Sequence, residues 1–181
     1  MAVVAALLAA GGGTRFAGPT HKLLTEVRGK RIVDWAYEHA VASGLDVVAV
    51  VSGAVPLGLP GEVHNPRWAE GMATSLQVAI GAATDAGADA LVVGLGDQPG
   101  IDPEAWRLVA AAVDAPIAIA SYAGERGNPV LLHRDVWPLL PATGDIGARK
   151  IAREREDLVT EVACPGDPYD VDTVEDLDRW S

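Results

Sequence analysis

A run of glycines followed by two cations is the first feature of the sequence that could do chemistry. Gly11, Gly12 and Gly13 stand directly after an apolar run, and Arg15 and Lys22 follow in the same loop. Glycine lets backbone N–H groups approach a phosphate closely, and successive amides can form a nest that binds an anion. Arg and Lys add positive charge for phosphate oxygens. The loop predicts a phosphate site, although a strand-to-helix turn with solvated charges would have the same composition.

Two common phosphate-binding motifs can be tested against this loop. A dinucleotide-binding fingerprint would use Gly11 and Gly13, but Phe16 stands where its third glycine belongs. The acidic residue expected after the second predicted strand is also missing. A Walker loop starting at Gly13 would continue with Lys and then Ser or Thr after Gly18, but a Pro-Thr pair follows. The loop is therefore of a third kind.

Strands and helices are predicted to alternate along nearly the whole chain. Apolar runs of strand length lie at residues 3–8, 46–51, 90–95, 116–120, 130–132 and 158–162. Helical patterns lie at residues 31–42, 75–83, 104–113, 147–155 and 174–180. This alternation predicts an α/β fold with a mostly parallel sheet and helices on both faces. Ligands of such sheets bind beyond the carboxyl ends of the strands, which is where the glycine loop stands.

Capping residues predict where three of the helices begin. Thr74 and Gln77 have the spacing of a capping box. Asp102 followed by Pro103 is typical of a helix start, with the proline at the first helical position. Thr173 is expected to cap the last helix.

The composition limits the class of protein. The 181 residues are 49% hydrophobic and 22% charged, which is typical of a globular protein with a core. No linker or repeat interrupts them, so we expect one domain over residues 1–181. The formal net charge of −11 argues against a nucleic-acid partner, which would require clustered Lys and Arg. A small nucleotide is compatible with this charge, because its site needs only a few local cations and a metal.

The remaining features favour a cytoplasmic protein without a membrane partner. Residues 3–10 are apolar, but no basic segment precedes them and the run is too short to cross a bilayer. We expect them to form a buried strand. The one cysteine, Cys164, has no partner for a disulfide and no Cys-His motif around it. It is expected to be a small buried residue in an intracellular chain.

Six segments, in order along the chain, resemble the MobA/MocA-like molybdopterin nucleotidyltransferases. They are LAAGGGTR (8–15) with the later Lys22, NPRWAEGMATSL (65–76), GDQP (96–99), RGNPVL (126–131), TGDIGAR (143–149) and DVDTVEDL (170–177). Together they cover nearly the whole chain. The resemblance implies a three-layer, Rossmann-like nucleotidyltransferase fold. It also implies a reaction with Mg²⁺ in which an acceptor phosphate attacks the α-phosphorus of an NTP and expels pyrophosphate.

The resemblance further indicates the substrates. Guanylyltransferases of the group usually begin the loop with Leu-Ala-Gly-Gly and cytidylyltransferases with Leu-Ala-Ala-Gly, so Ala10 favours CTP. The acceptor implied is a molybdopterin-type phosphate, and an apo-molybdoenzyme is a further candidate partner. Three alternatives stay open: a guanylyltransferase, a sugar-phosphate nucleotidyltransferase, and a non-catalytic module that binds the nucleotide or cofactor and delivers it.

The same resemblance gives metal-binding roles to acidic residues. Asp97 is the expected main Mg²⁺ ligand, and its place after a buried strand and a glycine should bring it to the edge of the sheet. Asp172 is the expected second ligand, with Asp170 as a weaker candidate for that role. Each main candidate has a structural alternative, because Asp97 could be a turn residue before Pro99 and Asp172 could cap a helix.

The other site residues are also assigned by resemblance. Arg15, Lys22 and Asp97 are the expected catalytic residues, with the two cations holding the triphosphate. Arg15 and Lys22 are seven positions apart, which exceeds the spacing usual in the family. Asn128 and Asp145 are expected to face the acceptor, although Asp145 could instead cap the following helix. The residues expected to contact the nucleotide are Ala9, Ala10, Gly11, Gly12, Gly13, Thr14, Arg15, Lys22, Gly71, Ser75 and Asp97.

Overall fold

The structure, a computed structural model of residues 1–181, is built around a seven-stranded sheet. The strand order is β5-β4-β1-β6-β8-β7-β9. Neighbouring strands are parallel except at β8, which runs antiparallel to both β6 and β7. The predicted mostly parallel sheet is therefore confirmed. The strands are β1 (Val3–Ala9), β4 (Asp46–Ser52), β5 (Glu62–His64), β6 (Ala90–Leu95), β7 (Ile117–Tyr122), β8 (Glu125–His133) and β9 (Val159–Ala163).

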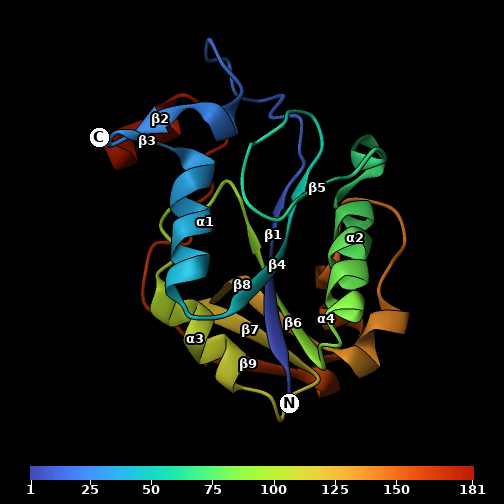
Figure 1. Cartoon of the computed structure of the whole chain (residues 1–181). Helices are drawn as coiled ribbons and strands as arrows, with labels where there is room; N and C mark the ends of the chain where they lie inside the picture. The colour runs from blue at the N-terminus through green and yellow to red at the C-terminus, as the bar shows by residue number, and fades with distance from the viewer.

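Helices cover both faces of the sheet, as predicted. Helices α1 (Ile32–Ala42) and α3 (Pro103–Ala111) lie on one face, and α2 (Met72–Asp85) and α4 (Ala148–Glu154) lie on the other (Figure 1). The molecule therefore has three layers. Short 3-10 helices cover Lys22–Leu24, Trp68–Glu70, Arg134–Leu139, Glu156–Leu158 and Glu175–Trp180. No helix has both the length and the apolar composition needed to cross a membrane.

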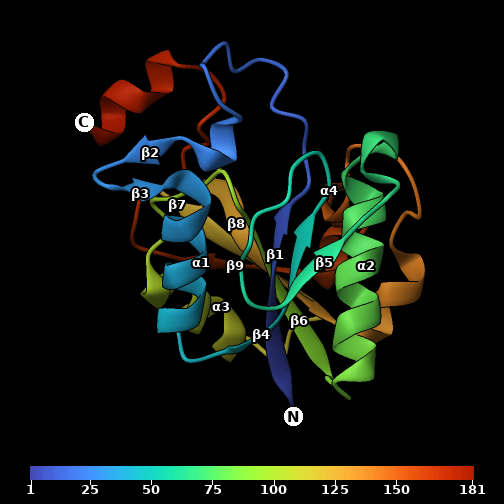
Figure 2. The same ribbon diagram turned by 45° about the horizontal axis from the view of Figure 1, so that its top comes forward.

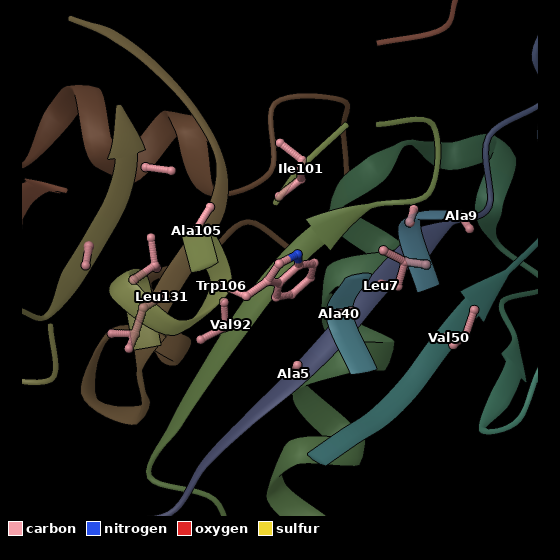
Figure 3. Close-up of a cluster of buried hydrophobic side chains, with 14 of the residues drawn as sticks. Ala5, Leu7, Ala9, Ala40, Val50, Val92, Ile101, Ala105, Trp106 and Leu131 are labelled. Carbon is pink, nitrogen blue, oxygen red and sulfur yellow. The ribbon is translucent and has the colours of Figure 1, made fainter. Parts of the chain in front are cut away.

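Strand β1 is buried on both sides, and its side chains alternate between two cores. Ala5 and Leu7 belong to the core beneath α1 and α3, whereas Ala6 and Leu8 belong to the core beneath α2 and α4. This is why the strand is apolar at nearly every position, as a parallel strand between two helix layers must be. Figure 3 shows the first core, in which the indole of Trp106 lies over β6.

The loops after β1, β4 and β6 gather at one edge of the sheet, opposite the N-terminus (Figure 1). The C-terminal segment returns to this edge and lies beside the glycine loop (Figure 2). A small apolar cluster of Phe16, Val27, Ile32 and Val171 joins the segment after β1 to the C-terminal segment. The sheet and this cluster together fix the loops that carry the predicted site residues.

Two predicted helix caps are wrong. Helix α2 begins at Met72 after Gly71, so Thr74 lies inside the first turn and bonds to the carbonyl oxygen of Gly71 at 2.9 Å. The last helix is a 3-10 helix without a side-chain cap, so the cap expected at Thr173 is not formed, and Asp176 within the helix binds the chain before it. Its carboxylate accepts from the backbone N–H groups of residues 172 and 173. Asp102 caps α3 as predicted, accepting from the N–H of Glu104 at 2.7 Å.

Several short strands were not predicted. The apolar run at residues 130–132 is only the end of β8, whose first half is polar. A small hairpin of β2 (Glu26–Val27) and β3 (Lys30–Arg31) and the edge strand β5 lack apolar runs altogether. Such strands are set by turns and neighbouring chain, so hydrophobic periodicity does not reveal them.

Gly94→Ala tests how tightly the first core is packed. A methyl group at Gly94 would lie 2.4 Å from ring atoms of Trp106, which is 2% exposed. Overpacking of this kind should lower the free energy of unfolding by about 1–3 kcal/mol, measured by urea denaturation. Gly81→Ala in α2 is the matched control, because nothing lies within 4 Å of its new methyl group. The control should gain about 0.5–1 kcal/mol, and equal effects of the two changes would contradict this description of the core.

Candidate active site

Four charged side chains meet beside the glycine loop. The Lys22 ammonium lies 2.7 Å from Asp97 Oδ2 and 3.0 Å from Asp172 Oδ1. Arg15, which is largely exposed, reaches the other oxygen of Asp172 at 2.9 Å. The loop after β1, the loop after β6 and the C-terminal segment thus supply one ionic cluster. The long spacing between Arg15 and Lys22 still brings both cations to the predicted metal ligands.

The side chains of the two carboxylates do not cap a helix, although Asp97 stands in a turn, as the structural alternative for it expected. Asp172 uses its side chain on the two cations, while its own backbone N–H is bonded by Asp176. The Asp97 carboxylate faces Lys22. Its backbone carbonyl, by contrast, binds the C-terminal segment by accepting from the N–H of Val171 at 2.9 Å. Both side chains are therefore directed at the cluster and do not cap a helix.

The electrostatics of the cluster follow from partial burial. Burial alone would lower the pKa of Lys22, but Asp97 and Asp172 outweigh it and hold that pKa above its ordinary value. Partial burial raises the pKa of Asp170, and the nearby charge of Asp97 acts in the same direction. Asp170 accepts from the buried amide of Gln98 at 2.6 Å and does not pair with Lys22. Asp172 is thus better placed than Asp170 to share a cation with Asp97.

A cavity of about 350 Å³ opens beside this cluster. Its walls bring together nine of the residues predicted to contact the nucleotide, namely Ala9, Ala10, Gly11, Gly12, Gly13, Lys22, Gly71, Ser75 and Asp97. Thr14 and Arg15 are exposed in the same loop but do not line the cavity. Asp145, predicted to face the acceptor, lines it as well.

The His21 ring closes the glycine loop with two hydrogen bonds, which are called the His21 clasp below. Its Nε2 lies 3.0 Å from the carbonyl oxygen of Gly11, and its Nδ1 accepts from the N–H of Leu23 at 3.2 Å. These two bonds together require a neutral ring with its proton on Nε2. Burial lowers the pKa of His21, and the charge of Lys22 lowers it further. The position of His21 next to Lys22 is the one sequence feature that hints at this role.

The turn at residues 143–147 packs onto the start of α2. Gly144 accepts from the N–H of Ala73 at 2.9 Å and donates to the carbonyl of Glu70 at 3.1 Å. A methyl group on Gly71 would lie 2.4 Å from the carbonyl carbon of Gly144, so only glycine fits there. Helix α4 has no side-chain cap, and the capping role considered for Asp145 is therefore wrong.

A second cavity of about 340 Å³ adjoins the first and shares Leu8, Met72 and Leu95 with it. Asn128 lines it, as do Arg126, Arg149 and Arg153. The Arg126 guanidinium is held by Glu156 and Glu161, whereas Arg149 and Arg153 form no ion pair. The second cavity is otherwise mainly apolar, and Met72, which is 41% exposed, separates the two spaces.

Sequence reasoning missed two residues of the site besides His21. Trp68 lines the first cavity, and a methyl group on Gly12 would lie 3.2 Å from its ring. Gln98 anchors the C-terminal segment by donating to the carbonyl oxygen of Pro168 and to Asp170. Both stand inside motifs that carried the family resemblance, which was the available signal.

The donor set suits a divalent cation held partly by its ligands. No group of three or more His, Cys, Asp or Glu side chains forms a closed metal site. Asp97 and Asp172 nevertheless converge on one positive centre, the Lys22 ammonium. Mg²⁺ is commonly bound by one or two carboxylates together with substrate phosphates and water. The two aspartates therefore fit such an ion in the presence of a nucleotide.

Comparison with known proteins gives the family. The chain belongs to the MobA-like NTP transferase domain family, whose model matches residues 5–159. It is a nucleotidyltransferase with the Rossmann-like fold of that group.

Two curated relatives and one solved structure are similar over almost the full chain. The chain is 31% identical to "Nicotine blue oxidoreductase" of Paenarthrobacter nicotinovorans, over 98% of this chain and 95% of that protein. It is 26% identical to "Purine catabolism protein PucB" of Bacillus subtilis (strain 168), over 97% and 94%. The crystal structure of Rv0371c from Mycobacterium tuberculosis H37Rv matches with a TM-score of 0.83 at 28% identity, over 99% and 96%. Rv0371c has also been solved as a complex with manganese.

The His21 clasp predicts a pH-dependent loss of stability. A lowered folded-state pKa means that the unfolded chain binds the proton more readily, so the clasp stabilises the fold above about pH 6.5 and less as the pH falls. His21→Gln should therefore be less stable than wild type at about pH 7.5, and the gap should narrow at about pH 5.5. Guanidinium denaturation at both pH values measures this. Exposed His64→Gln is the control, and a gap for His21→Gln that does not change with pH would contradict the clasp.

Proposed function

We propose that the protein transfers CMP from CTP to the phosphate of a molybdopterin-type acceptor in the presence of Mg²⁺. The observation that carries this proposal is the Lys22 ammonium between Asp97 and Asp172, at a glycine-lined cavity with a second cavity beside it. The first cavity suits a nucleoside triphosphate. The second suits its acceptor, since the two spaces meet at Met72 and Leu95.

The nucleotide half of the site rests on the glycine loop. Backbone amides of Gly11, Gly12 and Gly13 would bind phosphate oxygens, because glycine permits their close approach. Lys22 uses two of its three N–H donors on the aspartates, which leaves a third for a phosphate oxygen. The exposed fork of Arg15 can turn toward a triphosphate from the mouth of the cavity.

The acceptor half rests on the composition of the second cavity. Its apolar lining fits an organic body, and Arg149 and Arg153 are free to meet anionic groups. Asn128 can orient the acceptor phosphate by hydrogen bonding. Asp145, at the mouth of the neighbouring cavity, is suited to orient a hydroxyl group near the junction.

The reaction exchanges one phosphate–oxygen bond for another. An acceptor phosphate oxygen forms a bond to the α-phosphorus of CTP, and the bond from that phosphorus to the β-phosphate oxygen breaks, releasing pyrophosphate. When bound, Mg²⁺ neutralises phosphate charge and stabilises the leaving group. Lys22 and Arg15 add positive charge where negative charge develops. Asp97 and Asp172 would hold the cation, and the walls of the cavity would align the reactants.

CTP is preferred over GTP because of Ala10, which the resemblance associates with cytidylyltransferases. Ala10 is 6% exposed and lies in the wall of the first cavity. A guanylyltransferase or a sugar-phosphate nucleotidyltransferase would use the same loop and aspartates, since these act on the triphosphate. The choice of base and acceptor is therefore the part of the proposal that a substrate comparison must decide.

Two other activities are less well supported. A non-catalytic module that delivers a cofactor to an apo-molybdoenzyme would not need the full set of Arg15, Lys22, Asp97 and Asp172, all of which are present. An oxidoreductase, as one relative is named, would need a redox cofactor site. The glycine loop departs from the dinucleotide fingerprint, with Phe16 in place of its third glycine.

Pyrophosphate release tests the activity and Asp97 together. Wild-type protein with Mg²⁺, molybdopterin cofactor and CTP should release pyrophosphate, and Asp97→Ala should lower kcat by about 100-fold or more, because charge stabilisation of the reacting phosphates is lost. Asp46→Asn, at the opposite edge of the sheet, should leave the rate unchanged. Release with GTP alone would overturn the choice of base, and full activity of Asp97→Ala would overturn the metal site.

Thermal unfolding tests whether a cation competes with Lys22. In Lys22→Gln the two carboxylates lose their ammonium partner, so Mg²⁺ or Mn²⁺ should raise the Tm more in this variant than in wild type. The extra shift should disappear in the double variant Lys22→Gln, Asp97→Asn. Equal shifts in wild type and Lys22→Gln would show that the cation binds elsewhere.

A further inference from the structure

A buried amide stands behind the wall of the first cavity. Asn65 is 1% exposed, and its backbone N–H donates to the carbonyl of Ser52 at 2.8 Å at the end of β4. Its side-chain oxygen accepts from the N–H of Arg67 at 3.0 Å. This bond fixes the orientation of the amide, because only the oxygen can accept. The Asn65 nitrogen must therefore point toward α2.

That nitrogen donates to two hydroxyl groups in the first turns of α2. The Asn65 Nδ2 lies 2.8 Å from Thr74 Oγ1 and 2.9 Å from Ser75 Oγ. The Thr74 hydroxyl donates its own hydrogen bond to a backbone carbonyl, either that of Gly71 at 2.9 Å or that of Arg67 at 3.0 Å. Its hydrogen bonds are therefore complete within the protein.

Ser75 is different because its proton has no partner. An amide nitrogen can only donate, so Ser75 Oγ must accept from Asn65. Ser75 Oγ donates to no protein acceptor, although the residue is only 3% exposed and lines the first cavity. A buried hydroxyl with a free proton at a cavity wall offers a donor to whatever the cavity binds.

We propose that Asn65 is a positioning residue that sets the direction of the Ser75 hydroxyl, so that Ser75 donates a hydrogen bond to the acceptor edge of the bound base. This inference rests on the proposed function, since it requires a nucleotide in the first cavity. Cytosine presents O2 and N3 as adjacent acceptors, and a donor at Ser75 complements them. Asn65 thus contributes to base recognition without touching the base.

Exchanging the amide for a carboxylate reverses this direction. In Asn65→Asp the carboxylate accepts the Ser75 proton, and the serine then presents only lone pairs to the cavity. A base acceptor would face another acceptor. Ser75→Ala removes the donor more simply and touches no other hydrogen bond than that from Asn65.

Calorimetric binding of CTP and of tripolyphosphate, which has no base, tests the proposal. Ser75→Ala and Asn65→Asp should each weaken CTP binding by about threefold to tenfold, the loss expected for one hydrogen bond, and leave tripolyphosphate binding unchanged. The double variant should bind CTP no more weakly than Asn65→Asp, because both changes remove the same donor. Thermal unfolding of each variant shows whether the fold is retained.

The outcomes separate this inference from the proposed function. Unchanged CTP binding by Ser75→Ala would overturn the inference even where Asn65→Asp fails to fold. Equal weakening of CTP and tripolyphosphate by Asn65→Asp would reduce Asn65 to a structural role. Wild-type protein that binds GTP in place of CTP would overturn the proposed base. In that case, variants that bind GTP more weakly but tripolyphosphate normally would still support the donor at Ser75. Wild-type protein that binds no nucleotide would overturn both.

Discussion

The contact of Lys22 with Asp97 and Asp172 holds together three parts of the chain that are remote in sequence. Asp97 and Asp172 follow Lys22 by 75 and 150 positions, and both bonds are 3.0 Å or shorter. Parallel strands place Lys22 and Asp97 at one sheet edge, because the carboxyl ends of β1 and β6, which precede them, lie side by side. Asp172 is brought to them by the C-terminal segment, which Gln98 and a small apolar cluster help to anchor. The ionic cluster is therefore a product of the whole topology.

The elements with strong periodicity could be predicted from the sequence, and the polar contacts could not. Residues 3–8 read correctly as a doubly buried strand because every side chain meets a helix layer. The predicted cap at Thr74 is wrong because the helix starts earlier, at Met72. The preceding Gly71 has a φ of 111°, and the turn at Gly144 packs where its side chain would be. Local spacing carries no information on such distant packing.

The candidate site shows the same division. Family resemblance identified the residues that line the first cavity, and the structure brings nine of them together. The resemblance assigned no role to His21, Trp68 or Gln98, although the last two stand inside its motifs, because their roles depend on partners far along the chain or on ring orientation. Met72 lies between the two cavities, and its flexible thioether side chain suits a boundary that must admit reactants of different shape.

The late position of Asp172 also orders events during synthesis. Lys22 and Asp97 can meet once β6 has emerged from the ribosome, whereas Asp172 follows 75 residues later. Domains tend to form from the N-terminal side as the chain is made. A nascent chain can therefore form the lysine–aspartate pair first, and the second carboxylate joins it when the C-terminal segment folds back. Assembly of the full ionic cluster is thereby delayed until the sheet is complete.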